Sequence, residues 1–191
     1  MESLLAEIKN CNLCQANLPL GPNPVVSASA NSRIAIIGQA PGKRVHDSGI
    51  PWDDKSGERL RDWLGVDPNQ FYDPDLFALV PMGFCYPGKG KSGDLPPRKE
   101  CPPTWHEQLF GQMPNIRLTI LIGTYAQNYY LPKDGYLNLT DRVKSFRNFL
   151  PSTIVLPHPS PRNNIWIKKN PWFELELLPE LRSTVDGVLL R

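Results

Sequence analysis

The chain has 191 residues and a formal net charge of +2, a length that suits one domain with a sizeable core. So small a net charge excludes binding of nucleic acid through overall charge, so any such surface has to be a local patch. No apolar run approaches the roughly 20 residues of a membrane span, and the N-terminus has no signal-peptide core. We expect one domain over residues 1–191, a monomer in the bacterial cytosol without membrane contact.

Apolar runs typical of buried strands alternate with segments of helical periodicity. The clearest strand, "RIAIIG" at 33–38, is continuously apolar. The helix predicted at 56–65 has Ser56 as a plausible N-cap and Gly65 as its stop. In chain order, the sequence predicts a helix at 2–10, strand at 33–38, helix at 56–65, strand at 76–84, long loop at 86–103, helix at 104–113, strand at 118–123, helix from 124, basic segment at 141–150, strand at the start of 152–164 and helix at 171–190.

This alternation indicates an α/β fold with a central, roughly four-stranded parallel sheet flanked by helices on both faces. Ligands bind at the carboxyl ends of the strands in such sheets. Three predicted strands lead into unusual loops, "GQAPGKR" (38–44), "GFCYPGKGKSGD" (83–94) and "LPHPSPRNN" (156–164). We expect these loops to meet at one rim and form a site, the alternative being ordinary turns.

The cysteines have a suggestive spacing. Cys11 and Cys14 form a C-x-x-C pair, and fifteen residues separate Cys85 from Cys101. Structural disulfides are not expected in the cytosol, whereas four thiolates suit an iron–sulfur cluster or zinc. The ligand types leave both metals open, and four separate buried thiols are the alternative.

Three motifs carry a family resemblance: "GQAPG" at 38–42, "GIPW" at 49–52 and "LPHPSPRNN" at 156–164 resemble loops of the uracil-DNA glycosylase superfamily. In its family-four members the first motif reads G-E-A-P-G and an aromatic residue follows ten positions later, as Trp52 follows Gly42 here. The resemblance implies a monofunctional DNA glycosylase of base excision repair that removes uracil or another deaminated or damaged base. The cysteine spacing resembles that of families four and five, which implies a structural [4Fe–4S] cluster.

The resemblance also implies roles for single residues. His158 matches the histidine that hydrogen-bonds the oxygen of the leaving base, where a neutral imidazole N–H would stabilise developing negative charge. Trp52 matches the aromatic residue that stacks on the base, and the backbone amides of Gln39 and Ala40 match those that contact the base or a water. Further base-binding residues implied are Gly38, Pro41, Gly42 and Asp53.

Three positions depart from family patterns. Ala40 stands where the best-known family has an activating aspartate, although families four and five also have alanine. Gln39 replaces the family-four glutamate, and an amide can orient water but cannot act as a base. Pro81 replaces an asparagine that reads the edge of uracil, which favours a broader base range or a weak enzyme.

An acid could come from the loop "HDSGIPWDD" at 46–54, because a carboxylate beneath the sugar would stabilise the positive charge of the transition state. We place Asp47 first, before Asp53 and Asp54, and regard Asp94 as a weaker candidate. Each of these acids could instead be a solvated loop charge or a cap.

The DNA surface is predicted to be a basic, turn-rich rim. Trp166 beside lysines could enter the base stack during base extrusion, the alternative being a core tryptophan. The predicted DNA-binding residues are Lys43, Arg44, Lys89, Lys91, Ser160, Arg162, Asn163, Trp166 and Lys168.

Two other functions stay open. The chain could be a catalytically weak, cluster-bearing module that recognises damaged or single-stranded DNA, which Gln39, Ala40 and Pro81 would explain. An N-glycosidase acting on small nucleosides is the more distant alternative, and the basic rim argues against it.

Overall fold

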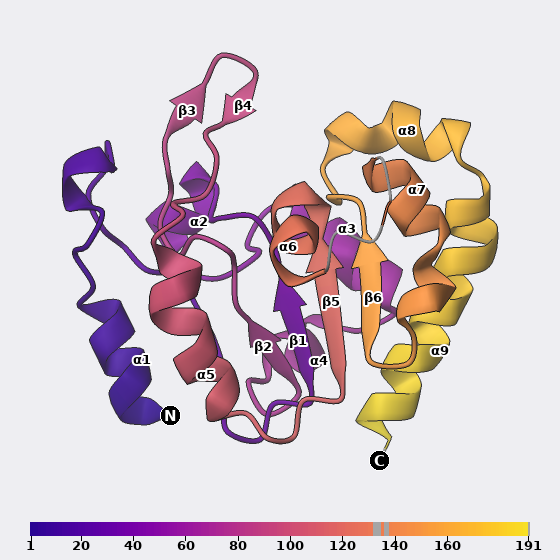
Figure 1. Ribbon diagram of the computed structural model, residues 1–191, viewed down its shortest axis with the longest axis horizontal. Helices are drawn as coiled ribbons and strands as arrows, with labels where there is room; N and C mark the ends of the chain where they lie inside the picture. The colour runs from indigo at the N-terminus through magenta and orange to yellow at the C-terminus, as the bar shows by residue number, and fades with distance from the viewer. Residues whose placement is uncertain (132–134, 136–137, 191) are drawn as a thin grey trace.

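A parallel sheet of four strands in the order β2–β1–β5–β6 lies at the centre of the protein, which confirms the predicted fold class (Figure 1). The computed structural model describes residues 1–131, 135 and 138–190. Ile36 of the second strand in this order pairs with Leu79 on one side and with Ile120 on the other. The strands are β1 (Ile34–Ile37), β2 (Phe77–Leu79), β5 (Leu118–Ile122) and β6 (Thr153–Leu156).

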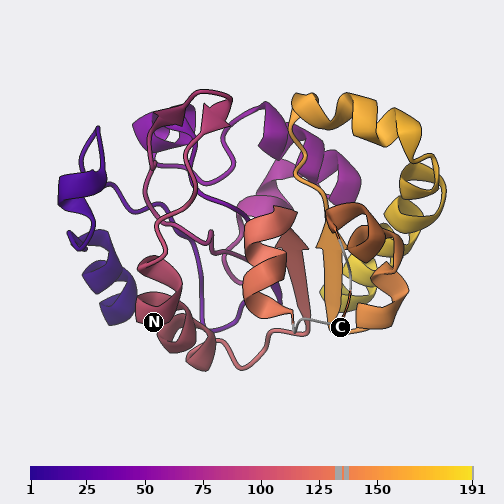
Figure 2. The ribbon, with the colours of Figure 1, turned by 45° about the horizontal axis from the view of Figure 1, so that its top comes forward.

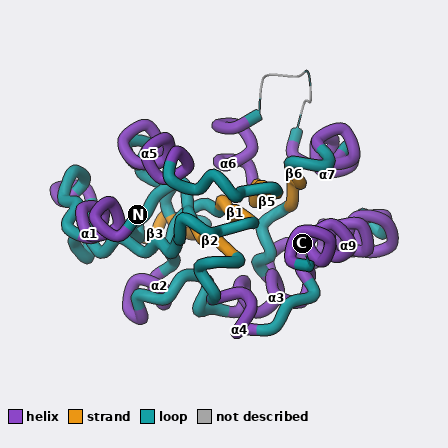
Figure 3. Tube along the Cα trace, turned by 90° about the horizontal axis from the view of Figure 1, so that it is seen from below, coloured by secondary structure: helices purple, strands orange, loops and turns teal. Residues whose placement is uncertain are grey.

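Helices cover both faces of the sheet, which explains why its strands read as unbroken apolar runs. Figure 3 shows α5 and α6 on one side and α3, α4 and α9 on the other. All four residues of β1 are buried. The helices are α1 (Glu2–Lys9), α2 (Lys43–Ser48), α3 (Lys55–Leu64), α4 (Pro68–Tyr72), α5 (Glu107–Gly111), α6 (Gly123–Tyr130), α7 (Leu139–Lys144), α8 (Asn164–Lys169) and α9 (Leu178–Leu189).

Several predicted boundaries shift for identifiable reasons. Asp54, not Ser56, caps α3, because its side chain accepts a hydrogen bond from the Gly57 N–H at 2.8 Å. Gly65 ends that helix as predicted, with a φ of 72°. The predicted loop at 86–103 contains a short antiparallel hairpin, β3 (Lys89–Gly90) and β4 (Gly93–Asp94).

The sequence patterns missed the short helices α2, α4, α7 and α8, of which α7 falls in the predicted basic segment at 141–150. The signal for α4 was present, because Asp67 and Gln70 form a capping box ahead of Phe71. The predicted helices at 104–113 and 171–190 each begin with a π-helical stretch, Pro102–His106 and Phe173–Leu177. Among the described residues, no helix has the length and apolarity that crossing a bilayer requires.

The loops after β1, β2 and β6 meet at the carboxyl end of the sheet, as predicted (Figure 2). The Gly83 N–H donates to the carbonyl of Gln39 at 3.0 Å, which joins the first two loops. The Arg162 guanidinium donates to the carbonyl of Ser92 at 2.7 Å, which joins the last loop to the β3–β4 hairpin. These contacts bring chemically distinctive segments from distant parts of the chain to one rim.

Candidate active site

His158 lies two residues beyond the end of β6, in a loop that fixes its imidazole. The backbone N–H of Ser160 donates to its Nδ1 at 3.2 Å, and the Asn163 side-chain amide donates to its carbonyl at 2.6 Å. Because Nδ1 accepts a hydrogen bond, the proton of the neutral ring is on Nε2. Nε2 makes no hydrogen bond with any described residue.

Burial lowers the pKa of His158, although the negative charge of Asp54 acts in the opposite direction. The imidazole is therefore neutral at pH 7, because its ordinary pKa is already about 6.5. The result is a fixed, neutral N–H donor that has no partner among the described residues. Such a group can hydrogen-bond an oxygen on which negative charge develops.

Trp52 faces His158, with 5.8 Å between the ring centroids. Its backbone is left-handed, with a φ of 58°, a conformation that is strained for a bulky residue. Two glycines pack so closely against Trp52 that neither could carry a side chain. A Cβ on Gly57 would lie 1.8 Å from the Trp52 carbonyl, and one on Gly38 would lie 2.7 Å from the indole ring.

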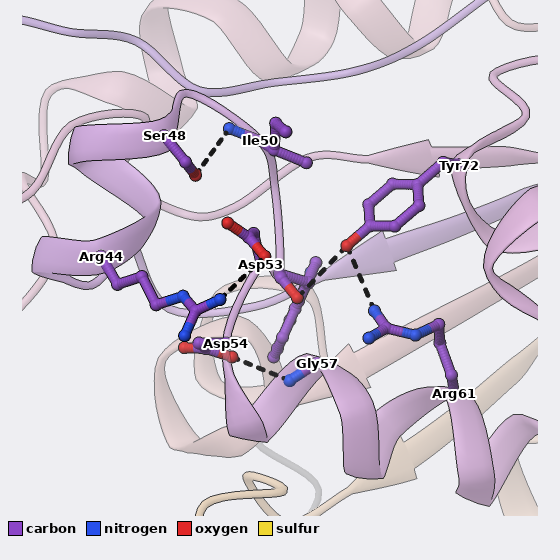
Figure 4. Close-up of polar contacts among 9 residues, drawn as sticks. Arg44, Ser48, Ile50, Asp53, Asp54, Gly57, Arg61 and Tyr72 are labelled. Atoms are coloured by element: carbon purple, nitrogen blue, oxygen red, sulfur yellow. Dashed lines mark hydrogen bonds and ion pairs between the residues drawn. The ribbon is translucent and has the colours of Figure 1, made fainter.

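The hydroxyl of Tyr72 also donates to the carbonyl of Trp52, at 3.4 Å, while Arg61 donates to that hydroxyl at 3.2 Å (Figure 4). The sequence patterns did not single out these two supporting residues, because they lie on α3 and α4, away from the motifs. A strained residue that is held by several neighbours is typical of functional sites. The indole is thus fixed close to the imidazole.

Two adjoining cavities surround this pair. A small cavity of about 50 Å³ lies against Trp52, and a more polar one of about 440 Å³ extends toward the β3–β4 hairpin. Both are lined by His158, Asp54, Ala40 and Gly42. Of the other predicted residues, Pro41 and Pro81 line the small cavity, and the polar one is lined by Gln39, Ser160, Arg162 and Asn163.

The acid beside His158 is Asp54, and the structure places Asp47 elsewhere. Asp47 lies on α2, where it pairs with Lys43 at 2.6 Å with both side chains more than half exposed, and it is not among the described residues that line either cavity. Asp53 pairs with Arg44 at 3.5 Å (Figure 4). The helical turn of α2 explains the difference, because it directs Asp47 toward the residue four positions earlier.

Asp94, at the end of β4, also lines the polar cavity. Burial raises its pKa, and the charge of Arg162 acts in the opposite direction. The amide of Gln39 donates to the carbonyl of Leu95 at 3.3 Å, so it is held toward the hairpin. The hairpin thus closes one side of the cavity, a role that its sequence did not reveal.

The predicted DNA-binding residues fall into two groups. Lys89 and Lys91 are exposed at the β3–β4 hairpin, and Lys168 is exposed on α8. Trp166 instead faces inward, because its indole donates to the Thr140 hydroxyl at 2.8 Å and the ring packs against the core. Trp166 is therefore partly buried against the core in this structure, and its contact with DNA stays a prediction.

All four cysteines line one small cavity, together with Arg98 and Trp105. Burial raises the pKa of the Cys101 thiol to about 12. Among the described residues, no group of three or more His, Cys, Asp or Glu side chains is arranged to hold a single metal ion. Two residues that line this cavity also carry a buried donor without a partner in the described part of the chain, the Trp105 Nε1–H and the Arg98 Nε–H.

The family model described as the uracil DNA glycosylase superfamily matches residues 25–182. The matched stretch contains the loops after β1, β2 and β6, and with them His158, Trp52 and Asp54. It includes Cys85 and Cys101 but not the C-x-x-C pair near the N-terminus.

Proposed function

This chain belongs to the uracil DNA glycosylase superfamily, and we propose that it is a monofunctional DNA glycosylase that hydrolyses the N-glycosidic bond of uracil or of another deaminated or damaged base. The observation that carries the proposal is the neutral His158, whose Nδ1 accepts a hydrogen bond so that its Nε2–H remains as a donor at a cavity. Base excision repair in the bacterial cytosol is the process in which this activity would serve.

The base has to leave the DNA stack before its bond to the sugar can be cleaved. The small cavity beside Trp52 would take the extruded base, with the indole as its stacking surface. As the bond breaks, negative charge accumulates on the base, and the Nε2–H of His158 would donate to its oxygen. A neutral donor suits this step because it leaves a proton on the enzyme and the charge on the leaving base.

The sugar acquires positive charge in the same step. Asp54 is the carboxylate that lines both cavities and acts electrostatically on His158, so we assign to it the stabilising role first considered for Asp47. One oxygen of Asp54 accepts from the Gly57 N–H, which fixes the side chain. Gln39 would orient the attacking water through its amide, and the proton that this water loses balances the proton that the released base takes up from solvent.

The DNA strand would cross the rim. Lys89 and Lys91 on the hairpin and Lys168 on α8 are exposed and can meet phosphates. Lys43 and Arg44 form surface ion pairs, which contribute little and can be exchanged for phosphate contacts. Arg162 bridges the hairpin and the His158 loop, so phosphate binding there would act on both walls of the cavity.

We further propose that the protein is closest to families four and five and that Cys11, Cys14, Cys85 and Cys101 hold a [4Fe–4S] cluster. The support is their shared cavity and the two unpartnered N–H groups on Trp105 and Arg98, described residues that line it, since hydrogen bonds to sulfur commonly accompany such clusters. A zinc ion would require all four sulfurs to lie about 2.3 Å from one ion, and therefore closer to one another than the four cysteine sulfurs around a cluster. When bound, a cluster would tie the N-terminal segment to the loop around Arg98.

One assay tests the glycosylase proposal. Purified protein is incubated with oligonucleotides that contain uracil, hypoxanthine, xanthine or ethenocytosine, and alkali then cleaves any abasic product. We expect strand cleavage with at least one base and none with unmodified DNA. Tight DNA binding without abasic product from any base would instead support the second candidate, a catalytically weak DNA-binding module, for which Gln39 and Pro81 are the favouring observations.

The metal proposal has a separate test. We expect about four iron and four sulfide per chain, with both lost in Cys85→Ser. Lys91→Ala, on the exposed hairpin, is the control that should leave the metal content unchanged. A colourless protein with one zinc per chain would contradict the cluster assignment.

A further inference from the structure

A third cavity, of about 730 Å³, opens beside the two that surround His158. Its walls are α6 and the proline-rich segment that follows β4. We call it the aromatic cleft, and the residues that matter for its chemistry are Leu95, Arg98, Lys99, Tyr125, Asn128 and Tyr129. Nothing in the proposed excision step uses it.

Two tyrosines give the cleft a stacking surface. Tyr125 and Tyr129 lie four residues apart on α6 and therefore on the same face of the helix. They are 42% and 50% exposed, which is unusual for two adjacent large rings. Tyr129 is also fixed, because its ring packs edge-on against Tyr130 with a centroid distance of 5.0 Å.

The cleft also carries oriented polar groups. The buried Arg142 donates to Oδ1 of Asn128 at 2.9 Å, so the amide nitrogen of Asn128 is left as the available donor. The exposed Lys99 adds positive charge to a wall that is otherwise largely apolar, whereas Arg98, which also lines the cleft, is paired with Glu100 at 2.7 Å. Flat rings, a side-chain amide and cations together are the chemistry with which proteins bind unpaired bases next to a phosphate backbone.

The cleft and the catalytic cavity are linked through residues that contact or follow one another. Gln39 lines the catalytic cavity, and its amide donates to the carbonyl of Leu95, which lines the cleft. Met82 lines the cleft too, and the neighbouring Pro81 lines the small cavity beside Trp52. We therefore take a strand with one base in the small cavity to be able to reach the aromatic cleft through a neighbouring base.

We propose that the aromatic cleft binds a second, unpaired base of the same strand, stacked on Tyr125 and Tyr129. This inference rests on the proposed action on DNA and names its substrate class. A base can enter the cleft only when it is unstacked and unpaired, so single-stranded or locally melted DNA is preferred over intact duplex. The positive charge of Lys99 beside the two rings favours a nucleic-acid strand over an apolar peptide as the occupant.

The test uses binding, so it does not depend on catalysis. The probe is a single-stranded oligonucleotide with a tetrahydrofuran abasic analogue and one 2-aminopurine, placed in turn at each of the neighbouring positions. We expect the fluorescence of 2-aminopurine to be quenched on binding at one position. Tyr125→Ala with Tyr129→Ala should abolish this quenching and weaken single-strand binding roughly tenfold, with a much smaller effect on duplex.

Two controls isolate the rings. The double Tyr→Phe variant keeps both faces and should behave as the wild type, and Leu175→Ala changes an exposed apolar residue outside the cleft. Because Tyr129 packs against Tyr130, the single variant Tyr125→Ala repeats the test without disturbing that contact. A thermal unfolding curve shows which variants are folded.

The outcomes separate the two proposals. Quenching that depends on the rings supports the inference even if the wild type yields no abasic product, which would count against the glycosylase alone. Excision without quenching at any position, or quenching and affinity unchanged in the alanine variants, would overturn the inference and leave the glycosylase intact. Equal affinity for single strand and duplex would also overturn it.

Discussion

Two histidines in this protein share a low pKa but differ in what surrounds them. His106 lies in a buried cluster between α5 and α6, and burial lowers its pKa to about 4. His158 lies at the rim, and burial lowers its pKa as well. Both rings are therefore neutral at pH 7.

The difference lies in the ring nitrogens. In His106 both are occupied, Nε2 by the carbonyl of Pro81 at 3.0 Å and Nδ1 by the hydroxyl of Tyr130. The ring of His106 is also stacked on Phe84. In His158 one nitrogen is occupied, and the other makes no bond with a described residue although the ring lines two cavities. A perturbed pKa thus marks burial, and an unused donor at a cavity marks chemistry.

Removing the imidazole at the rim should give the largest effect. We expect His158→Ala to slow base excision by about 10²- to 10³-fold, because one donor to the developing negative charge is lost. The free energy of unfolding should change little. Single-turnover excision rates and urea denaturation of the same samples measure the two effects. A variant that excises at the wild-type rate would remove His158 from the reaction.

The buried histidine should show the reverse behaviour. His106→Phe keeps a ring of similar shape but leaves the carbonyl of Pro81 and the hydroxyl of Tyr130 without a partner. We expect the free energy of unfolding to fall by about 2–3 kcal/mol. The excision rate of the folded protein should stay within about threefold of the wild type. A large rate loss without loss of stability would show that His106 acts on the site.

Acid should reveal His106 through stability. Its pKa is about 4 in the folded state and about 6.5 when unfolded, so between these values the unfolded chain binds the extra proton. The free energy of unfolding should therefore fall as the pH drops from about 6.5 to 4, by at most about 1.4 kcal/mol per pH unit from this group. Denaturation of wild type and His106→Phe at several pH values isolates the slope, which the variant should lack.

The sequence was most informative where local patterns decide the structure. The apolar run at 33–38 could hardly be anything but a buried strand, and three loops after parallel strands had to share a rim. The sequence was least informative about the direction in which individual side chains point. Asp47, Asp53 and Asp54 lie within eight residues, and only the turn of α2 and the start of α3 decide which of them lines the cavities.

Trp166 shows the same limit. The sequence "NNIWIKKNPWF" fits an exposed wedge or a core residue equally well. The hydrogen bond that turns the Trp166 indole inward is made to Thr140, which lies 26 residues earlier on α7. His106 carried no local signal at all, because its partners Pro81 and Tyr130 are 25 and 24 residues away. Partners distant in sequence determine the environment of a side chain, and no spacing rule anticipates them.

Two acids differ in the same way as the two histidines, because Asp54 lines both cavities whereas Asp47 forms an exposed ion pair on α2. Asp54→Asn keeps the helix cap, since asparagine caps as well as aspartate, but removes the negative charge from the cavity. We expect excision to slow about tenfold, because the positive charge on the sugar loses one stabilising partner. Asp47→Asn is the matched control, which breaks only the exposed pair with Lys43 and should change the rate less than about twofold. If Asp47→Asn instead had the larger effect on single-turnover rates, α2 would have to rearrange when DNA binds, and Asp47 rather than Asp54 would be the acid that faces the sugar.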